Sequence, residues 1–282
     1  MKKKLISLFA AVLGVMCLAG CGESKPAQTE PDANGGQTAA SSDYDYIKNN
    51  GKMVIGITIY EPMNYYDENN NLTGFDTEFA TDLCSRLGVT PSFQVIDWDM
   101  KETELKSKNI DCIWNGLTVT EERRANMDFT KTYLLNRQCV VVKSENVSKY
   151  KDKESLASAM MSAESGSAGE SAIVDDPVLS AASYTASNSQ QDALVALNAG
   201  NYDAIVIDYT MASSTVGKGD FSGLTVVDGI ELANEEYAIG FRVGSDMTAR
   251  VNDVITEMIT DGTLAAIAQK YDMTDLYESA VK

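Results

Sequence analysis

The stretch SQQDALVALNAGNYDAIVID, residues 189–208, predicts a helix followed by a buried strand. Ser189 begins the helix, and Gly200 ends it, because glycine readily takes the left-handed backbone conformation found after helices. The apolar run at residues 204–207 then fits a buried strand, with Asp208 at its carboxyl end. This stretch is therefore typical of one helix–strand unit of an α/β protein.

The same alternation of strands and helices recurs along the chain. Apolar runs indicate further strands at residues 53–57, 110–114 and 139–142. Apolar residues at helical spacing indicate a helix that Asp76 caps and Gly88 ends, a helix that Thr118 or Thr120 caps, and a helix over residues 251–259. This pattern predicts an α/β fold with mainly parallel sheets.

In sheets of this kind, ligands bind beyond the carboxyl ends of the strands. Two segments fit that position, namely residues 115–118 and the stretch that starts at Asp208. Residues 165–169, Ser-Gly-Ser-Ala-Gly, form a turn of small residues before another predicted helix.

The composition excludes several classes of function. The 282 residues include 41 acidic and 23 basic side chains and no histidine, so the formal net charge is −18. Nucleic-acid binding needs clustered Lys and Arg, so no nucleic-acid partner is expected. Without histidine, Ser–His and Cys–His catalysis within this chain is excluded. We predict no cofactor and no metal site, and we expect Cys84, Cys112 and Cys139 to be buried apolar side chains.

The N-terminus has the pattern of a secretion signal. Three lysines at residues 2–4 precede an apolar run at residues 5–18, which is too short to span a membrane comfortably. The run ends in Leu-Ala-Gly-Cys at residues 18–21, which resembles the lipobox of bacterial lipoproteins. We therefore predict a signal peptide at residues 1–20 and a lipidated Cys21, against the alternative of an ordinary cleavage site with an incidental cysteine.

Residues 21–43 are expected to carry the lipid and to form a flexible tether. Residues 22–43 contain Pro, Gly, Ser and Gln but no apolar residue larger than Ala. Such a segment cannot offset its ordering entropy by burial. The chain should therefore be held at the extracytoplasmic face of the bacterial cell membrane by the acyl chains of Cys21.

Several motifs resemble the polar amino acid solute-binding proteins of bacterial ABC importers, the family 3 type, in lipoprotein form. The most specific are Asn-Gly-Leu-Thr-Val-Thr-Glu-Glu-Arg at residues 115–123 and Met-Asp-Phe-Thr at 127–130. Gly-Phe-Asp at 74–76, Tyr-Ala-Ile-Gly-Phe at 237–241, Asp-Gly-Thr-Leu at 261–264 and Lys-Tyr at 270–271 also match. The resemblance covers residues 44–275 and is weakest over residues 144–190.

The resemblance implies a type II periplasmic-binding-protein-like fold, with two α/β lobes joined by two hinge strands, in a monomer. Lobe 1 would comprise residues 44–134 and 238–282, and lobe 2 residues 138–232. The hinges would lie near residues 133–137 and 233–237. Closure of such lobes around a ligand is a known type of domain motion.

The resemblance also implies the ligand site. Arg123 would bind the carboxylate of an amino acid, with Thr118, Gly116 and the amides of the following helix, and Asp208 would bind the ammonium group, with Asn115 as a further acceptor. Each residue also has an alternative role without a ligand. Arg123 could be a solvated helix arginine, as expected for Arg124, and Asp208 could be a helix N-cap. The remaining predicted contacts are the aromatic residues Tyr60 and Trp98, together with Thr58 and Ser167. Trp114 is expected in the core.

Departures from the family pattern bear on the ligand. Thr58 and Ile207 stand where some relatives carry charged or polar residues, which predicts a small neutral or polar L-amino acid, with cystine or glutamine-like ligands among its members, although Glu61 lies close in sequence. Residues 158–164 replace the usual basic and glycine-rich approach to the lobe 2 turn. The contacts from Ser165, Ser167 and Ala168 therefore stay open.

The implied function is capture of a free L-amino acid and its delivery to an ABC permease, without catalysis. Two alternatives share the same scaffold, because fold alone does not decide function. One is a ligand-sensing lipoprotein that signals to a membrane partner. The other is a dehydratase-type enzyme, for which Glu61 or Glu164 could supply the general acid.

Replacing the predicted lipid-bearing residue tests the anchor. We expect Cys21→Ser either to release the mature protein from the membrane or to leave its precursor uncleaved, because the thiol would no longer accept lipid. Fractionation of cells followed by immunoblotting measures both outcomes. Normal membrane fractionation and normal processing of the variant would contradict a lipid anchor at this residue.

Overall fold

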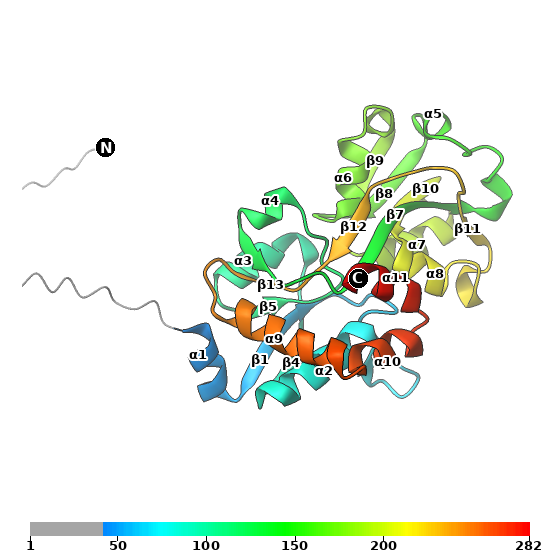
Figure 1. Ribbon diagram of the computed structural model, residues 1–282. Helices are drawn as coiled ribbons and strands as arrows, with labels where there is room; N and C mark the ends of the chain where they lie inside the picture. The colour runs from blue at the N-terminus through cyan, green and yellow to red at the C-terminus, as the bar shows by residue number, and fades with distance from the viewer. Residues whose placement is uncertain (1–41) are drawn as a thin grey trace, which may run out of the picture. The chain divides into compact units, whose positions relative to one another are not determined.

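Residues 42–282, which the computed structural model describes, form two mixed β-sheets, each flanked by helices (Figure 1). They belong to one unit, Ala40–Lys282. The predicted signal peptide, Cys21 and the tether up to residue 41 lie outside the described residues. The alternation of strands and helices follows the order that the sequence predicts.

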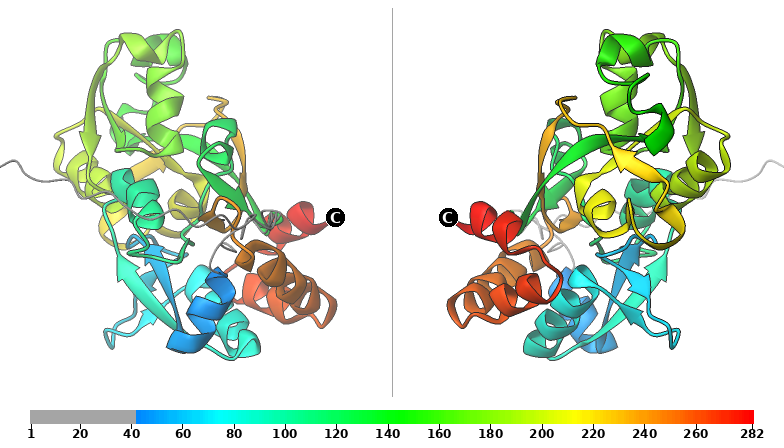
Figure 2. Two further views of the ribbon diagram at one scale, coloured as in Figure 1. Left: turned by 90° about the vertical axis from the view of Figure 1, so that its left-hand side faces the viewer. Right: turned by 90° about the vertical axis from the view of Figure 1, so that its right-hand side faces the viewer.

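The first sheet combines segments from both ends of the described chain. Its strand order is β4 (Thr90–Val95), β1 (Lys52–Ile57), β5 (Cys112–Ile113), β13 (Gly240–Arg242) and β6 (Met127–Phe129). Strand β1 pairs in parallel with β4 and β5, whereas β13 pairs antiparallel with β5 and β6. Three mutually packed helices accompany this sheet: α2 (Phe75–Leu87), α9 (Met247–Thr260) and α10 (Thr263–Lys270) (Figure 2).

The second sheet is built from the middle of the chain. Its strand order is β11 (Leu224–Val226), β7 (Leu134–Lys143), β10 (Ala204–Asp208), β8 (Met160–Glu164) and β9 (Ser183–Ser187). Strand β8 pairs in parallel with β9 and β10, whereas β7 is antiparallel to β10 and β11. Helices α6 (Ala168–Val174), α7 (Gln190–Ala199) and α8 (Tyr209–Thr215) pack on its strands. Both sheets are therefore mixed rather than mainly parallel.

The remaining elements are short. The helices are α1 (Asp43–Asn50), α3 (Lys101–Lys106), α4 (Glu121–Arg124), α5 (Lys153–Leu156) and α11 (Thr274–Val281). The strands are β2 (Tyr65–Tyr66) and β3 (Leu72–Thr73), which form a hairpin, and β12 (Asn234–Tyr237). Single 3-10 turns lie at Trp98–Met100, Ser144–Asn146, Leu179–Ala181 and Gly219–Phe221.

Strand β7 runs without a break from one sheet to the other. Its first residues pair with β12, from Leu134 opposite Tyr237 to Arg137 opposite Asn234, and Gln138 then pairs with Asp208 of the second sheet. The β7–β12 pair occupies the positions where the sequence predicts the two hinges. Helix α11, predicted as part of lobe 1, packs against β7 itself.

Several local sequence signals are confirmed. Helix α7 begins after Ser189, whose hydroxyl accepts from the Asp192 amide, and ends at Gly200 in the left-handed conformation. Trp114 is fully buried, and its ring packs edge-on against Phe79. The three cysteines predicted to be buried are free and buried: Cys84, Cys112 and Cys139. Burial raises the pKa of the Cys84 thiol to about 12, so this group is a packing residue at neutral pH.

Asp76 does not cap helix α2, contrary to the prediction. The cap is Gly74, at φ 123°, where an added Cβ would lie 2.2 Å from the Met63 carbonyl oxygen. Asp76 is instead buried, and its Oδ2 accepts from the Gly116 amide at 2.8 Å and from the Tyr133 hydroxyl at 3.0 Å. Its carboxylate therefore holds the loop after β5 from behind.

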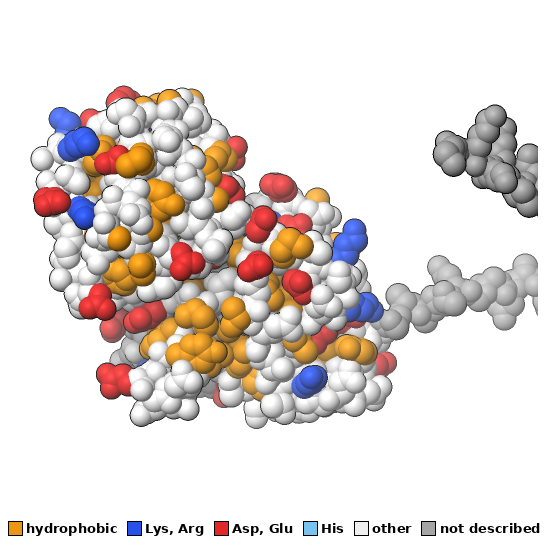
Figure 3. Space-filling view, turned by 180° about the vertical axis from the view of Figure 1, so that it is seen from behind, with side chains coloured by type: hydrophobic (Ala, Val, Ile, Leu, Met, Phe, Trp, Pro, Cys, Tyr) orange, Lys and Arg blue, Asp and Glu red, His pale blue; other side chains and the backbone are white. Residues whose placement is uncertain are grey.

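The surface of the described chain is acidic. On the face shown in Figure 3, Asp and Glu side chains are more numerous than Lys and Arg. This distribution repels the phosphates of nucleic acid over long range. Among residues 42–282, no helix combines the length and the apolar character that a membrane span requires.

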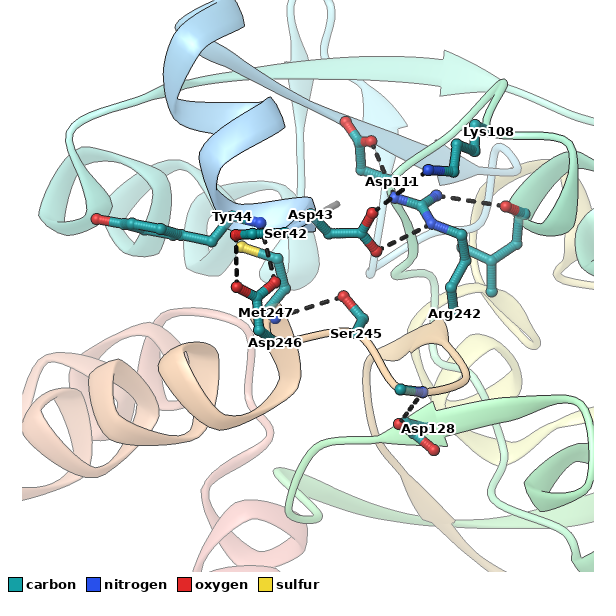
Figure 4. A network of polar contacts seen from close by, with 12 residues as sticks. Ser42, Asp43, Tyr44, Lys108, Asp111, Asp128, Arg242, Ser245, Asp246 and Met247 are labelled. Atoms are coloured by element: carbon teal, nitrogen blue, oxygen red, sulfur yellow. Dashed lines mark hydrogen bonds and ion pairs between the residues drawn. The ribbon is translucent and has the colours of Figure 1, made fainter. Parts of the chain in front are cut away.

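The N-terminal end of the described chain is tied to the start of α9 (Figure 4). The Ser42 hydroxyl donates to Asp246 at 2.6 Å, and the Tyr44 amide donates to the same carboxylate at 3.0 Å. Ser42 also caps α1, which begins at Asp43. Residues 42 and 43, the last of the predicted tether, thus belong to the folded part.

Arg242 at the end of β13 completes this attachment (Figure 4). Its guanidinium pairs with Asp43 at 3.1 Å and with Asp111 at 3.4 Å, and it also donates to the Ile110 carbonyl at 2.8 Å. Both carboxylates and the guanidinium are largely shielded from solvent. Breaking such a pair is costly, because the partner charge stays buried.

We expect Arg242→Ala to lower the free energy of unfolding by about 3–5 kcal/mol, because it leaves the shielded Asp111 without a cation and Asp43 with only the Lys108 ammonium at 3.8 Å. For a chain of this length the melting temperature should fall by roughly 6–20 °C, as measured by thermal denaturation followed by circular dichroism. Arg250→Ala is the control: its exposed guanidinium stacks on Tyr44, a contact of about 1 kcal/mol or less. Equal melting temperatures for the two variants would show that the ion pairs contribute nothing.

Candidate functional site

The structure brings the predicted site residues together around one small cavity. It has a volume of about 10 Å³ and is lined by Tyr60, Trp98, Asn115, Gly116, Thr118, Arg123, Glu164, Ser167, Ala168, Gln190 and Asp208. Of the predicted contacts, all but Thr58 are among them. The lining comes from segments that follow β1 and β5 of the first sheet and from the ends of β8 and β10 of the second.

Arg123 is buried, whereas its neighbour Arg124 is not. Arg123 is 7% exposed, and it donates to the Thr118 carbonyl at 2.8 Å and to the Gly166 carbonyl at 3.0 Å. Burial lowers the pKa of the Arg123 guanidinium, which nevertheless stays a cation. The half-exposed Arg124 lies 3.8 Å from Glu121. The alternative without a ligand role, a solvated helix arginine, therefore describes Arg124 and not Arg123.

Helix α4, which carries Arg123, is a single turn. Thr120 rather than Thr118 caps it, because the Thr120 hydroxyl accepts from the Arg123 amide at 3.1 Å. This cap occupies one of the amides that the sequence analysis expects at this helix N-terminus, that of Arg123. Among residues 42–282, no carboxylate lies within ion-pair distance of the Arg123 guanidinium.

Asp208 lies at the end of β10 and is held by side-chain amides. Its Oδ1 accepts from Asn136 Nδ2 and Gln138 Nε2, both at 2.7 Å, and its Oδ2 accepts from Gln190 Nε2. Although Asp208 precedes α8, its side chain makes no capping hydrogen bond, so the alternative of a helix cap is wrong. Burial raises its pKa, while the amide hydrogen bonds act in the opposite direction.

Glu235 on β12 is a second buried carboxylate held by the same donors. It accepts from Asn136 at 2.8 Å, from Gln138 at 3.0 Å and from the Thr118 hydroxyl at 3.1 Å. Burial, followed by the charge of Asp208, raises the pKa of Glu235 to about 7. Two amides on the crossing strand β7 therefore connect the carboxylate of the second sheet to that of the β12 strand.

Glu164 at the end of β8 also lines the cavity. It is 3% exposed, and its Oε1 has no hydrogen-bond partner among the residues that the structure describes. Burial, followed by the charge of Asp208, raises its pKa to about 8, although Lys101 and Arg123 act in the opposite direction. Glu61, the other acid considered for catalysis, is exposed and does not line the cavity.

The two aromatic residues predicted to contact the ligand are both buried, Tyr60 against Thr210 of the second lobe and Trp98 in an apolar cluster of the first. The Tyr60 hydroxyl contacts the Thr210 hydroxyl and lies 3.0 Å from the Tyr237 hydroxyl. The Lys101 ammonium makes a cation–π contact with Trp98, with Nζ 5.0 Å from the ring centroid. It also donates to the carbonyls of Trp98 and Gly166. Burial, followed by the charge of Arg123, lowers the pKa of Lys101 to about 8.

Thr58 and Asn115 support the site from behind. The Asn115 side chain accepts from the Thr58 amide at 2.9 Å and from its hydroxyl at 2.6 Å, and it donates to the Thr58 carbonyl at 3.1 Å. The Asn115 side-chain amide is thus occupied by Thr58, so of the two predicted acceptors, the side chain and the backbone of Asn115, the backbone carbonyl is the one left for a ligand. Thr58 does not line the cavity and acts on it only through Asn115.

Gly116 and Ser167 shape the wall without offering free polar side chains. Gly116 has a φ of 57°, and an added Cβ would lie 2.9 Å from the rings of Tyr60 and Tyr237. The Ser167 hydroxyl caps α6 by accepting from the Glu170 amide at 3.1 Å. Ser167 and Ala168 line the cavity, whereas Ser165 does not.

The cavity is too small for an amino acid as it stands, because a single water needs about 10–15 Å³. A larger cleft of about 730 Å³ adjoins it and shares Thr118, Arg123 and Ser167 with it. Residues before and within α4 form one side of this cleft, and residues of α6 and β12 form the other. Ligand entry into the inner cavity therefore requires its two walls to move apart.

Chemically, the cavity combines a buried cation, Arg123, with two buried carboxyl groups that have no ion-pair partner: Asp208, which is hydrogen-bonded, and Glu164, whose Oε1 is not. Such an arrangement fits a small ligand with both a carboxylate and an ammonium group, since each desolvated charge then gains an opposite partner. In the described part of the chain, no cluster of Cys, Asp and Glu is arranged to hold a metal ion.

Several lining or supporting residues are not predicted by the sequence analysis. They are Lys101, Asn136, Gln138, Gln190 and Glu235. A usable signal exists for two of them: Asn136 and Gln138 lie two residues apart in a strand, between the apolar pairs at 134–135 and 139–140, and so point to the same face. Gln190 and Glu235 carry no comparable signal, because only the pairing of distant strands brings them to Asp208.

Comparison with known proteins identifies the family of this chain. The sequence profile of the bacterial extracellular solute-binding proteins, family 3, matches residues 53–274. The L-cystine-binding protein TcyJ of Escherichia coli (strain K12) is 28% identical over 232 residues, which cover 82% of this chain and 86% of that protein. The L-cystine-binding protein TcyA of Bacillus subtilis (strain 168) is 29% identical over 276 residues, which cover 96% of this chain and 97% of that protein.

Solved structures give the same result. The protein Tv2483 bound to L-arginine is 27% identical with a TM-score of 0.78, covering 85% of this chain and 98% of that one. A substrate-binding protein of an ABC uptake transporter from Streptococcus pneumoniae with bound histidine is 26% identical with a TM-score of 0.77, covering 86% and 99%. The predicted two-lobed, type II periplasmic-binding-protein-like fold is thereby confirmed. Because the family profile spans most of the sequence, this chain belongs to the bacterial extracellular solute-binding proteins of family 3.

Proposed function

We propose that this protein captures a free L-amino acid between its two lobes and delivers it to the permease of an ABC importer. The observation that carries the proposal is the placement of Arg123, on helix α4 after the first-sheet strand β5, and Asp208, at the end of β10 in the second sheet, in one cavity without an ion pair to any described residue. The relatives and neighbours named above bind cystine, arginine and histidine, which supports an amino acid as the ligand class.

The two residues suit the two charges of a zwitterion. The Arg123 guanidinium has N–H groups beyond those that it donates to Thr118 and Gly166, so it can bind a carboxylate by charge-assisted hydrogen bonds. The Asp208 carboxylate suits the ammonium group. Three side-chain amide donors fix its orientation. A ligand with only one of these charges would leave the other residue buried and unpaired.

Contacts across the lobes favour closure once a ligand is bound. Lys101 and Arg123 from the first lobe both donate to the Gly166 carbonyl of the second, at 2.9 Å and 3.0 Å. The Ser214 hydroxyl donates to the Glu61 carbonyl at 3.4 Å. A ligand that bridges Arg123 and Asp208 adds to these contacts only in the closed state, so it shifts the population toward that state.

The proposed location is the outer face of the cell membrane, with Cys21 as the lipid anchor. A tether formed by residues 22–41 would have a root-mean-square reach of roughly 25 Å. Because Ser42 and Asp43 are held by Asp246 and Arg242, that tether would be attached rigidly to the first lobe. The lobes could then open and close while the first lobe keeps a fixed attachment.

Removing the charge of either Arg123 or Asp208 tests ligand capture. Truncating one member of a buried charge pair costs about 2–5 kcal/mol, partly because its partner stays buried. We expect Arg123→Ala or Asp208→Ala to weaken binding of the best of the common L-amino acids by roughly 30-fold to several thousand-fold. Calorimetric titration of the purified variants measures the affinity, and melting curves establish that they fold.

Arg124→Ala is the matched control, because its half-exposed side chain lies on the same turn and does not line the cavity. Its affinity should equal that of the parent. If Arg123→Ala binds like the parent while Arg124→Ala does not, the assignment of the carboxylate-binding arginine is wrong. Unchanged affinity in both arginine variants would place the ligand elsewhere in the fold.

Uptake measurements distinguish transport from sensing. A bacterium that lacks this protein should lose most of its high-affinity uptake of the radiolabelled ligand, and the parent chain should restore it. Arg123→Ala should fail to restore uptake although it accumulates normally, because capture precedes delivery. Unchanged uptake in the deletion strain, with altered gene expression on ligand addition, would favour the sensing lipoprotein instead.

A further inference from the structure

Glu164 is the one cavity carboxylate without hydrogen-bond partners in the described chain. Its side chain ends β8 and faces the space that Arg123 and Asp208 also line, yet it is 3% exposed. Asp208 and Glu235 each accept from amide donors, whereas Glu164 Oε1 accepts from no described residue. Leaving a buried polar group unsatisfied costs free energy, so a native site that keeps one has a reason to do so.

The surroundings of Glu164 favour its neutral form at pH 7. The charged groups that act on it are Asp208 on β10, Asp192 on α7, Lys101 on α3 and Arg123 on α4. The two cations are already engaged with the Gly166 carbonyl, and burial outweighs them, so the pKa of Glu164 rises to about 8. A protonated carboxyl presents one donor and one acceptor to the cavity.

The charges of a bound amino acid are matched without Glu164. Arg123 takes the carboxylate and Asp208 takes the ammonium group, so Glu164 is left to face the ligand side chain. An anionic side chain would bring a further negative charge beside Asp208. A cationic one would require Glu164 to lose its proton close to Asp208 and Glu235. A primary carboxamide needs neither, because it accepts from the O–H and donates to the C=O of the same carboxyl group.

We propose that Glu164 is the specificity-determining residue of this site, and that it selects an amino acid whose side chain ends in a primary carboxamide through two reciprocal hydrogen bonds. The inference rests on the proposed capture of a free amino acid. A neutral ligand is then expected because of Glu164 and not because of Thr58 and Ile207, neither of which lines the cavity. Ile207 packs in the hydrophobic core instead.

The test compares ligands that share a backbone and differ at the end of the side chain. Purified parent protein is titrated calorimetrically with glutamine, asparagine, methionine, glutamate and arginine. We expect glutamine or asparagine to bind about 10- to 100-fold more tightly than methionine, because the apolar side chain leaves the Glu164 carboxyl unsatisfied. Glutamate and arginine should bind more weakly than the amide.

Two variants isolate the carboxyl group. Glu164→Met should remove the preference for the amide over methionine, whereas Glu164→Gln keeps one donor and one acceptor and should retain it. Glu154→Gln, at an exposed position on α5 of the same lobe, is the control and should behave as the parent. Melting curves of all variants show whether they are folded.

The pH profile gives a second readout. The proposed complex contains protonated Glu164, so the contribution of Glu164 to the affinity for the amide should be constant below about pH 7 and should fall as pH rises above about 8. Lys101 and Glu235 titrate nearby, but they remain in Glu164→Gln, whose profile should be flatter than that of the parent by the share due to Glu164.

Equal affinity for glutamine, asparagine and methionine would overturn the inference, and so would tightest binding of arginine with an affinity that rises with pH. In both cases loss of binding in Arg123→Ala would leave the proposed capture of amino acids standing. If no amino acid binds the parent, the proposed function and the inference both fail.

Discussion

The structure depends on the pairing of one strand with partners in both halves of the fold. Strand β7 is hydrogen-bonded to β12 through its first residues and to β10 and β11 through the rest. Asn136 and Gln138 lie on the part of this strand between the two sheets, and their amides hold Asp208 and Glu235 together. The same segment therefore connects the lobes and orients the carboxylates of the cavity.

Burial of charge is the second constraint. Arg123, Asp208, Glu164 and Glu235 are each less than one-tenth exposed, and the pKa shifts of all four follow from desolvation. Neutral amides and backbone carbonyls satisfy these groups in part, but they do not neutralise charge. A zwitterionic ligand would supply the missing opposite charges, which is why a site so expensive to bury suits binding rather than stability.

The scaffold around the cavity is held by contacts that leave the cavity residues free. Asp76 orients Gly116 from behind the loop, Asn115 is locked to Thr58, and Ser167 caps α6. Each of these side chains spends its hydrogen bonds on the protein. Support of this kind fixes the positions of the segments that carry Arg123 and Glu164. These segments belong to different lobes, so the two walls of the cavity can still move apart.

Helix limits and family motifs are encoded by short stretches of residues, so they can be predicted from the sequence alone. Ser189 and Gly200 delimit α7 through local backbone conformation, and the run from Thr118 to Arg123 specifies both its fold family and a buried arginine. Tertiary structure alone decided that Asp76 supports a loop instead of capping a helix, and that both sheets are mixed. It also decided that Glu164, Gln190 and Glu235 meet Asp208 at the cavity. These outcomes depend on which distant strands pair and in which direction, and no local propensity carries that information.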